Sequence, residues 1–492
     1  MLPTLKYPML LLPVFLSMKK NSFITNDSLQ NEMSSEWASL PLLPLRCILD
    51  HLSTEDAVAA MSVCRHWRSS VLLYEGHKET LKLRAKHLDK CLFLTRMFRK
   101  YTNKLHIYLD CNDAELDKFM SYVLPQFFDT LKLYELIFIG PSHLLIEHPN
   151  LPVVKLKRII TESLIHKHAH SLQKLALLGC EMGVVKNEND RFIHKNVEYY
   201  SRPLSFAKVA VAADAILSRS NILVYSTLQH MIVDYEQINI DALETLSELS
   251  SFSRLTLNVR NKRQVTYSPI DWDRVDACYP NGLEVSVNII AMPMKRMDEL
   301  IDNVLREGMA LTSLKVMYCK TLHQPLLEHI VRLYKETLRE LVWADAPYDS
   351  YDPYNRIVRT GPPDEFGICN VNPFILLCWQ CTQLRRLVIH GYWVWQYDLV
   401  GFARLRKSLA CVEVSALYTR QGRWPPGAVR VLCADAAPHT APHFVREMNE
   451  YTEFKWSPTP WSKLHPGLRA RASPDHRSQY VLQEALQPLE VT

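Results

Sequence analysis

Two short stretches of the sequence contain residue types that could bind a metal ion. The first, HKHAH, places His166 and His170 four residues apart on either side of His168. This spacing puts two imidazoles on one helix face, as zinc ligands require. The stretch lacks the glutamate of an H-E-x-x-H motif, and no third ligand is evident. We therefore expect a polar helix surface here and no metal site.

The second stretch, CWQC, is a single C-x-x-C pair formed by Cys378 and Cys381. A structural zinc site needs a second pair of ligands at a suitable spacing, and the sequence offers none. Most of the 12 cysteines lie in apolar runs, which is typical of buried free thiols in a reducing compartment. We expect Cys378 and Cys381 to pack in the core, without a cofactor, in a protein of the cytoplasm, the nucleus or both.

Other patterns that carry chemistry are missing from the sequence. It contains no G-x-G-x-x-G or Walker-type phosphate loop and no G-x-S-x-G nucleophile elbow. The 57 basic and 52 acidic residues leave a net charge of +5, which is weak for 492 residues. The apolar run over residues 8–17 contains two prolines and is too short to span a bilayer. We predict a non-catalytic protein that binds neither nucleic acid nor membrane.

The elements around residues 37–70 indicate a protein partner instead. Ser53 followed by Asp56 resembles a capping box and predicts a helix over 54–61, and Val63, Cys64 and Trp67 predict another. Three such short helices lack the interior volume to bury all their apolar side chains, so a partner surface is implied. An earlier helix should begin near residue 42, because Pro44 fits only a first turn and four apolar residues follow at helical spacing: Leu45, Ile48, Leu49 and Leu52.

The same stretch resembles the F-box, the adaptor-binding motif of SCF-type ubiquitin ligases. The resemblance departs from the family pattern at Leu43, where an acidic residue is usual, and at Pro44, where an aliphatic one is. It implies that the small SCF adaptor, which links F-box proteins to the cullin–RING scaffold, contacts eight residues of this chain: Leu40, Pro41, Leu45, Ile48, Leu52, Val63, Cys64 and Trp67.

Beyond residue 125 a pattern of the form L-x-x-L-x-L-x-x-(C/N) recurs. LQKLALLGC from Leu172 and LTSLKVMYC from Leu311 fit it fully, and LEVSVNII over 283–290 is a degenerate copy. Several starts lie 24 to 27 residues apart, within the 20–29 residues of a leucine-rich repeat, each a strand with a helical or irregular return. Looser copies start at Leu133, Leu228, Phe252, Leu338, Leu384 and Leu409.

These features predict an α/β protein, an N-terminal three-helix F-box followed by a degenerate leucine-rich-repeat solenoid. We expect a disordered leader over 1–34, the F-box over 35–80, a helical linker over 81–124, the repeat array over 125–417 and a mostly disordered tail over 418–492. A tyrosine-rich insertion in the array is a candidate contact for a substrate, because aromatic rings give large contact area at small entropy cost. Its tyrosines are Tyr348, Tyr351 and Tyr354.

The resemblance implies a substrate-recognition subunit of an SCF-type ubiquitin ligase. The F-box would bind the adaptor, and the array would bind an unknown protein substrate for ubiquitination and degradation. The alternative is a leucine-rich-repeat binding scaffold that is not assembled into a ligase.

Overall fold

The computed structural model describes most of the chain from residue 38 to residue 487. The gaps within this range are residues 53, 75–78, 110–112, 129–131, 141–154, 157–163, 180, 183–221, 262–266, 321, 347–354, 357–371, 419–429, 433–441, 458 and 460–462. The predicted leader over 1–34 lies outside the described residues.

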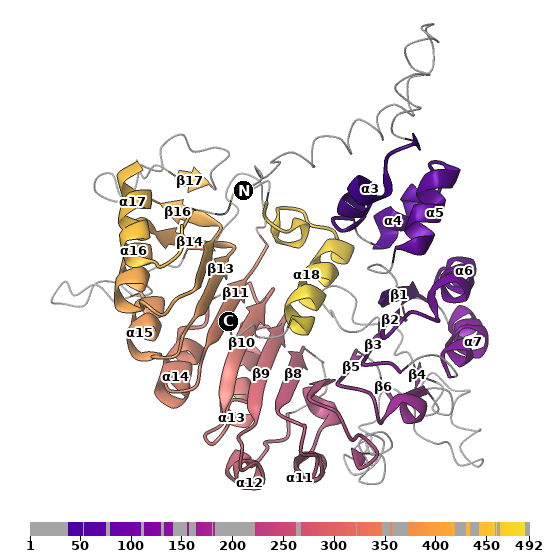
Figure 1. Cartoon of the computed structure of the whole chain (residues 1–492). Helices are drawn as coiled ribbons and strands as arrows, with labels where there is room; N and C mark the ends of the chain where they lie inside the picture. The colour runs from indigo at the N-terminus through magenta and orange to yellow at the C-terminus, as the bar shows by residue number, and fades with distance from the viewer. Residues whose placement is uncertain are drawn as a thin grey trace, which may run out of the picture.

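Three short helices form the N-terminal unit, shown in indigo in Figure 1. They are α3 (Leu42–Leu49), α4 (Thr54–Ala60) and α5 (Arg65–Leu73), and they have a small core of their own. The first helix begins directly after Pro41, as the sequence predicts.

The rest of the described chain is built on one sheet of 11 strands. Every neighbouring pair is parallel, and the strand order follows the chain order without a crossover. A parallel sheet in which each strand pairs only with its predecessor and successor, with a return arm between them, is the architecture of a leucine-rich-repeat-type solenoid. Its strands are β1 (Thr80–Arg84), β2 (Lys104–Tyr108), β3 (Glu135–Ile139), β5 (Lys174–Leu178), β7 (His230–Asp234), β8 (Arg254–Arg260), β9 (Glu284–Ile290), β10 (Leu311–Met317), β11 (Glu340–Ala344), β13 (Arg386–His390) and β15 (Cys411–Val414).

The predicted repeats coincide with these strands. Each of the eight leucine-rich copies contains one strand of the sheet, and the alternating segment over 283–290 contains β9. The array predicted from the leucine pattern is therefore confirmed, with nine of its strands placed by the sequence.

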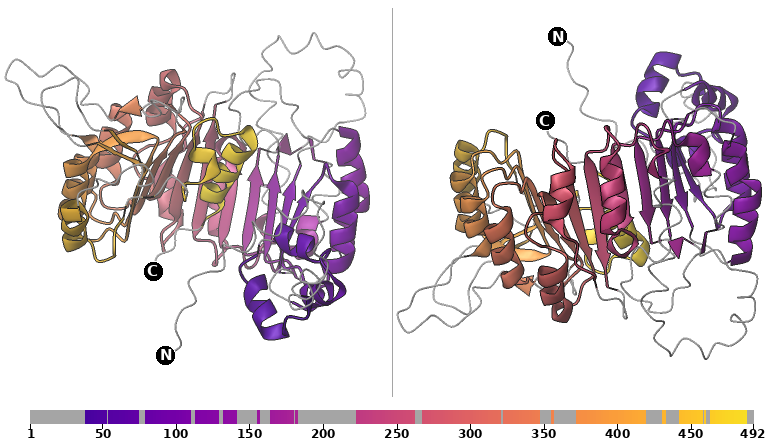
Figure 2. Two further views of the ribbon diagram at one scale, coloured as in Figure 1. Left: turned by 90° about the horizontal axis from the view of Figure 1, so that it is seen from above. Right: turned by 90° about the horizontal axis from the view of Figure 1, so that it is seen from below.

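Helices on the return arms cover the outer face of the sheet (Figures 1 and 2). Leu314 and Val316 of β10 share the main core with Leu326 and Ile330 of the helix that follows, α14. The covering helices are α6 (Leu88–Phe98), α7 (Asp113–Tyr122), α11 (Ile240–Ser247), α12 (Trp272–Cys278), α13 (Met297–Asn303), α14 (Gln324–Tyr334), α15 (Pro373–Gln380), α16 (Gln396–Leu405) and α17 (Pro442–Tyr451).

Side chains just beyond the strands link each repeat to the one before it. The carboxylate of Asp345, after β11, accepts hydrogen bonds of 2.9 and 3.0 Å from the backbone N–H of Lys320, after β10. The sulfur of Cys319, after β10, likewise accepts a hydrogen bond of 3.4 Å from the backbone N–H of Met292, after β9. The last cysteine of LTSLKVMYC therefore has a structural role. Buried backbone donors must find acceptors, and these side chains provide them where the strand ladder ends.

The structure differs from the predicted domain layout at both ends of the array. Residues 81–124 are not a helical linker, because β1 and β2 add two strands to the sheet. The described residues of the predicted tail over 418–492 include ordered elements: Phe444 and Met448 of α17 enter the main core, and α18 (Pro474–Leu486) packs on the sheet. The first segment extends the array by pairing with β3, and the second is stabilised by contacts with strands far away in the chain, which local composition does not reveal.

Short elements complete the structure. They are the strands β4 (Lys155–Leu156), β6 (Glu181–Met182), β12 (Asn355–Arg356), β14 (Tyr392–Trp395), β16 (Ala416–Tyr418) and β17 (Arg430–Leu432), and the 3-10 turns η1 (Leu124–Phe127), η5 (Tyr235–Gln237), η6 (Met294–Arg296) and η7 (Pro466–Leu468).

Candidate functional site

The core of the three-helix unit is made by one face of each helix. Leu45 and Leu49 of α3 lie fully enclosed among Ala57, Met61 and Val71. The side chain of Leu45, predicted to contact an adaptor, has no exposed surface in this structure. Leu45 instead holds the helices together.

Other apolar residues of the same unit face solvent. Leu43 is 73% exposed and Val63 is 57% exposed, and Pro41 is exposed beside Leu42. Each large apolar side chain left in water forgoes roughly 1.5–3 kcal/mol of burial free energy. Five further predicted residues are half-buried and so retain surface for a partner: Leu40, Ile48, Leu52, Cys64 and Trp67.

Hydrogen bonds bring the two ends of this motif together. The ring nitrogen Nε2 of His66 donates to the carbonyl of Leu40 at 2.7 Å, which fixes the segment before α3 against the start of α5. Cys64 is the N-cap of α5, and its sulfur accepts from the N–H of Trp67 at 3.4 Å. Val63 and Cys64 therefore precede the third helix rather than lying within it. The extended backbone of Cys64, with φ −156°, ends the preceding turn.

Comparison with known proteins identifies this unit. Residues 37–76 match the family model described as F-box domain. The chain contains an F-box domain. F-box only protein 33 of Homo sapiens is 46% identical over 63 residues, 12% of this chain and 11% of that protein. The Mus musculus protein of the same name is 49% identical over 52 residues, 11% of this chain and 9% of that protein. The chain thus matches only about a tenth of the length of these curated relatives.

Two solved structures resemble the array more distantly. A leucine-rich repeat-containing protein from Legionella pneumophila is 10% identical, covering 75% of this chain and 98% of its own, with a TM-score of 0.37. An internalin from Listeria monocytogenes is 12% identical, covering 75% of this chain and 89% of its own, with a TM-score of 0.25. These scores are low, so the solenoid assignment depends on this chain's own strand order and register.

The inner face of the array, opposite the covering helices, carries charged side chains in rows. Glu135 of β3 accepts a hydrogen bond of 2.5 Å from Nε2 of His106 and lies 3.5 Å from the Lys174 ammonium. Burial raises the pKa of this carboxyl, but His106 and Lys174 outweigh burial and hold the pKa at about 2. Glu135 belongs to a row of charged or polar side chains at paired positions on six neighbouring strands. The row consists of Lys104, Glu135, Lys174, His230, Arg254 and Glu284.

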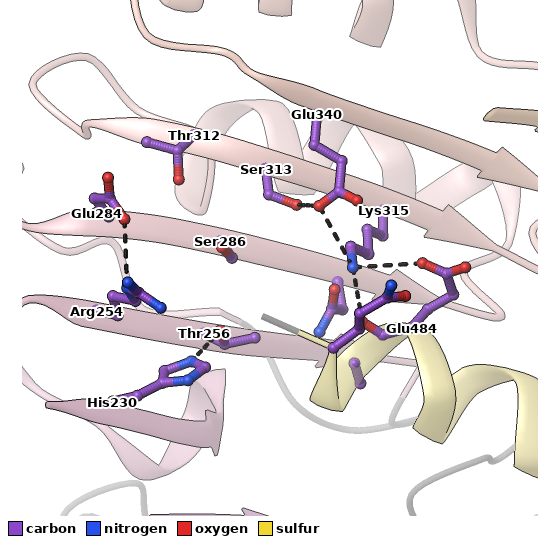
Figure 3. A pocket seen from close by; sticks show the side chains of 13 residues that line it. His230, Arg254, Thr256, Glu284, Ser286, Thr312, Ser313, Lys315, Glu340 and Glu484 are labelled. Carbon is purple, nitrogen blue, oxygen red and sulfur yellow. Dashed lines mark hydrogen bonds and ion pairs between the residues drawn. The ribbon is translucent and has the colours of Figure 1, made fainter. Parts of the chain in front are cut away.

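Helix α18 lies against this inner face (Figures 1 and 3). The buried Lys315 ammonium lies 3.4 Å from both the Glu340 and the Glu484 carboxylates. Arg386 of β13 donates to both oxygens of Glu484, at 3.1 and 3.2 Å, and also to Glu340. Two basic and two acidic groups thus form a closed network between three strands and α18.

The residues of this network were not predicted from the sequence. A signal for them is nevertheless present, because Lys315, Glu340 and Arg386 are charged residues within largely apolar strands. In the tail, Ser473 before a proline is a typical helix start, and its hydroxyl accepts from the N–H of His476 at 3.2 Å.

The residues considered for metal chemistry have structural positions. Cys378 and Cys381 are free thiols in the main core, as predicted, and burial raises the pKa of Cys381 to about 12. His166 and His170 are exposed, but His168 is not on a polar surface: it is buried, and its Nε2 donates to the Phe127 carbonyl at 2.8 Å. Burial lowers the pKa of His168, which keeps the ring neutral.

Two further observations concern the described ranges only. In them, no cluster of three His, Cys, Asp or Glu side chains is arranged to hold a metal ion. Nor is any helix within these ranges long and apolar enough to cross a bilayer. Tyr348, Tyr351 and Tyr354 lie outside the described residues.

Proposed function

We propose that this chain is the non-catalytic substrate receptor of an SCF-type ubiquitin ligase. The F-box domain at residues 37–76 carries the proposal, because an F-box implies binding to the SCF adaptor and through it to the cullin–RING scaffold. The repeat array supplies the second requirement of a receptor, an extended surface for a protein substrate.

The adaptor surface in this proposal consists of the predicted residues that keep solvent-accessible area. Pro41 and Val63 are its exposed members, and Leu42 and Leu43, which follow Pro41 in the chain, are exposed apolar residues as well. Helices that present an apolar face to a groove bind through a few such anchors. The half-buried residues at its margin are Leu40, Ile48, Leu52, Cys64 and Trp67.

The array contributes to ubiquitination by proximity in this proposal. A receptor that holds substrate at a fixed distance from the ubiquitin-charged enzyme raises the effective concentration of the substrate's lysines without itself reacting. The protein then needs no nucleophile or metal of its own.

The test is capture of the adaptor and the cullin from cell extract by the full chain and two variants. Val63→Asp places a charge on the exposed apolar surface without entering the F-box core, so it should abolish capture. Ser69→Asp is the matched control, since Ser69 is exposed on α5 two residues beyond Trp67, and it should capture normally. Trp67→Asp is less suitable because Trp67 packs against the core, and a charge there would unfold the helices.

The outcomes distinguish a ligase receptor from a repeat scaffold that is not part of a ligase. Capture by wild type and by Ser69→Asp, but not by Val63→Asp, supports the receptor. If wild type captures neither protein, the chain is a repeat scaffold outside the ligase. Normal capture by Val63→Asp would mean that the adaptor surface is assigned to the wrong residues.

A further inference from the structure

The inner face of the sheet holds α18 by an apolar contact on each side of a polar strip. Val481 packs with Met317 and Val342, while Leu482 packs with Ile137 and Ile232. These two apolar contacts belong to clusters separate from the main core, which lies between the sheet and the covering helices. Removal of α18 would therefore leave the main core intact.

The polar strip fixes the direction in which a helix lies on this face. The ammonium of Lys315 donates to the backbone carbonyl of Glu484 at 2.7 Å, and that of Lys174 donates to the carbonyl of Leu486 at 2.9 Å. Both carbonyls belong to the last turn of α18, where the helix has no partners of its own and its dipole is negative. Two cations of the sheet thus cap the C-terminal end of the helix.

The third cation of the strip selects a side chain. Arg386 binds the carboxylate of Glu484 through two parallel hydrogen bonds, the geometry in which guanidinium recognises carboxylate most selectively. Glu484 and Lys315 are buried and Arg386 is partly buried, so the strip binds this carboxylate in one defined position. The three cations of the strip together recognise the C-terminal end of a helix and an acidic residue within its last turn.

The face under α18 combines two apolar patches with a polar strip and differs in this from the face that the covering helices pack on. Where the covering helices pack, the strands present leucine, valine and isoleucine. Around α18 the strand centres present hydroxyl, amide and charged groups, and a small polar pocket remains beside the helix (Figure 3). Water can solvate such groups when α18 leaves, so exposure of this face costs less than exposure of an apolar core. These groups include Thr256, Ser286, Asn288, Ser313 and Lys315.

We propose that the inner face is a helix-binding groove, that α18 occupies it as a displaceable intramolecular ligand, and that the substrate of the array competes with α18. The substrate class that fits is a protein with an amphipathic helix that ends in this groove and carries a carboxylate in its last turn. The identity of the competitor as a ubiquitination substrate rests on the proposed function; the groove itself does not.

The experiment measures binding of a fluorescent peptide of residues 473–487 to the full chain. In wild type, α18 competes at an effective concentration of about millimolar, so the added peptide should bind weakly. Glu484→Lys in the chain reverses the charge that Arg386 and Lys315 hold, releases α18 and should tighten binding of the wild-type peptide roughly tenfold or more. Gln483→Lys is the matched control, because Gln483 is exposed one residue earlier, and it should bind as weakly as wild type.

A second measurement uses the wild-type chain, so it tests the proposal even if the Glu484→Lys chain does not fold. Hydrogen exchange should show that α18 amides open more often than those of β8, β9 and β10, as expected for a segment that leaves while the sheet persists. Equal protection and simultaneous exchange of α18 and these strands would overturn the proposal, as would a folded Glu484→Lys chain that binds the peptide no better than wild type. Neither measurement involves the F-box, so loss of adaptor capture with intact peptide binding would refute only the ligase assignment.

Discussion

Arg386 and Glu484 are 98 residues apart in the chain, and the guanidinium of one clamps the carboxylate of the other at 3.1 and 3.2 Å. Burial raises the pKa of Glu484, but Lys315 and Arg386 lower it more, so the carboxyl titrates below its ordinary range. This pair joins α18 to a strand of the sheet far from it in the chain.

The clamp predicts that Arg386→Lys loosens α18 although the charge is kept. A lysine ammonium cannot donate two parallel bonds to Glu484 while it also reaches Glu340, so we expect docking of α18 to weaken by about 1–3 kcal/mol. Hydrogen exchange of residues 474–486 measures this loss. Unchanged protection of these amides would show that the bidentate geometry contributes nothing.

The F-box core predicts opposite behaviour for two leucines on one helix. Leu45→Ala empties a fully enclosed site and should destabilise the three helices by about 2–4 kcal/mol. Leu43→Ala changes an exposed side chain and should alter their stability by no more than about 0.5 kcal/mol. Limited proteolysis within residues 42–73 distinguishes them, and equal cleavage rates would contradict the assignment of Leu45 to the core.

The turn after β13 predicts a specific intolerance at Gly391. This residue has φ +81°, and a Cβ atom there would lie 2.3 Å from the backbone oxygen of Asp345. Gly391→Ala should lower the free energy of unfolding by about 3 kcal/mol, from left-handed backbone strain and this clash together.

The matched control for this prediction is Gly282→Ala. Gly282 has a similar φ of +78°, but no atom lies within 4 Å of its would-be Cβ, so only the backbone strain of about 1 kcal/mol applies. Urea denaturation measures both variants. Equal losses would show that the approach to Asp345 is not close enough to matter.

The lowered pKa of Glu135 predicts an acid-sensitive contribution to stability. The folded pKa of about 2 lies below the ordinary 4.5, so the ionised carboxylate stabilises the fold above pH 4.5 and loses this effect as pH falls toward 2. Glu135→Gln should be less stable than wild type by roughly 1–2 kcal/mol near pH 6, and the gap should close toward pH 2. Urea denaturation at several pH values measures the gap, and parallel profiles would contradict the pairing with His106.

Local sequence patterns were sufficient to predict the helices and strands that are specified by residues only a few positions apart. The helices of the F-box could be placed from the spacing of Leu45, Leu49 and Trp67, because a helical stripe needs only neighbours three and four residues away. The nine strands of the array followed from a repeated leucine pattern for the same reason.

The sequence did not determine which of these residues reach a partner. Leu45 and Leu43 belong to one stripe-forming segment, yet one is enclosed and the other faces water, and only the packing of α4 and α5 decides between them. The strands β1 and β2 were missed although they pair with each other and with β3, as every other strand of the array pairs with its neighbours in the chain. The helix α18 was missed because its stability comes from strands far away in the chain.

The sequence by itself therefore determined an F-box followed by a parallel repeat array, because periodic apolar spacing specifies helices, strands and their repetition. Only the tertiary structure decided that the array begins at Thr80 and that its inner face holds α18. The physical reason is that Lys174, Lys315 and Arg386 are ordinary charges in the sequence; they become a site for a helix end only when three separate strands place them against Glu484 and Leu486.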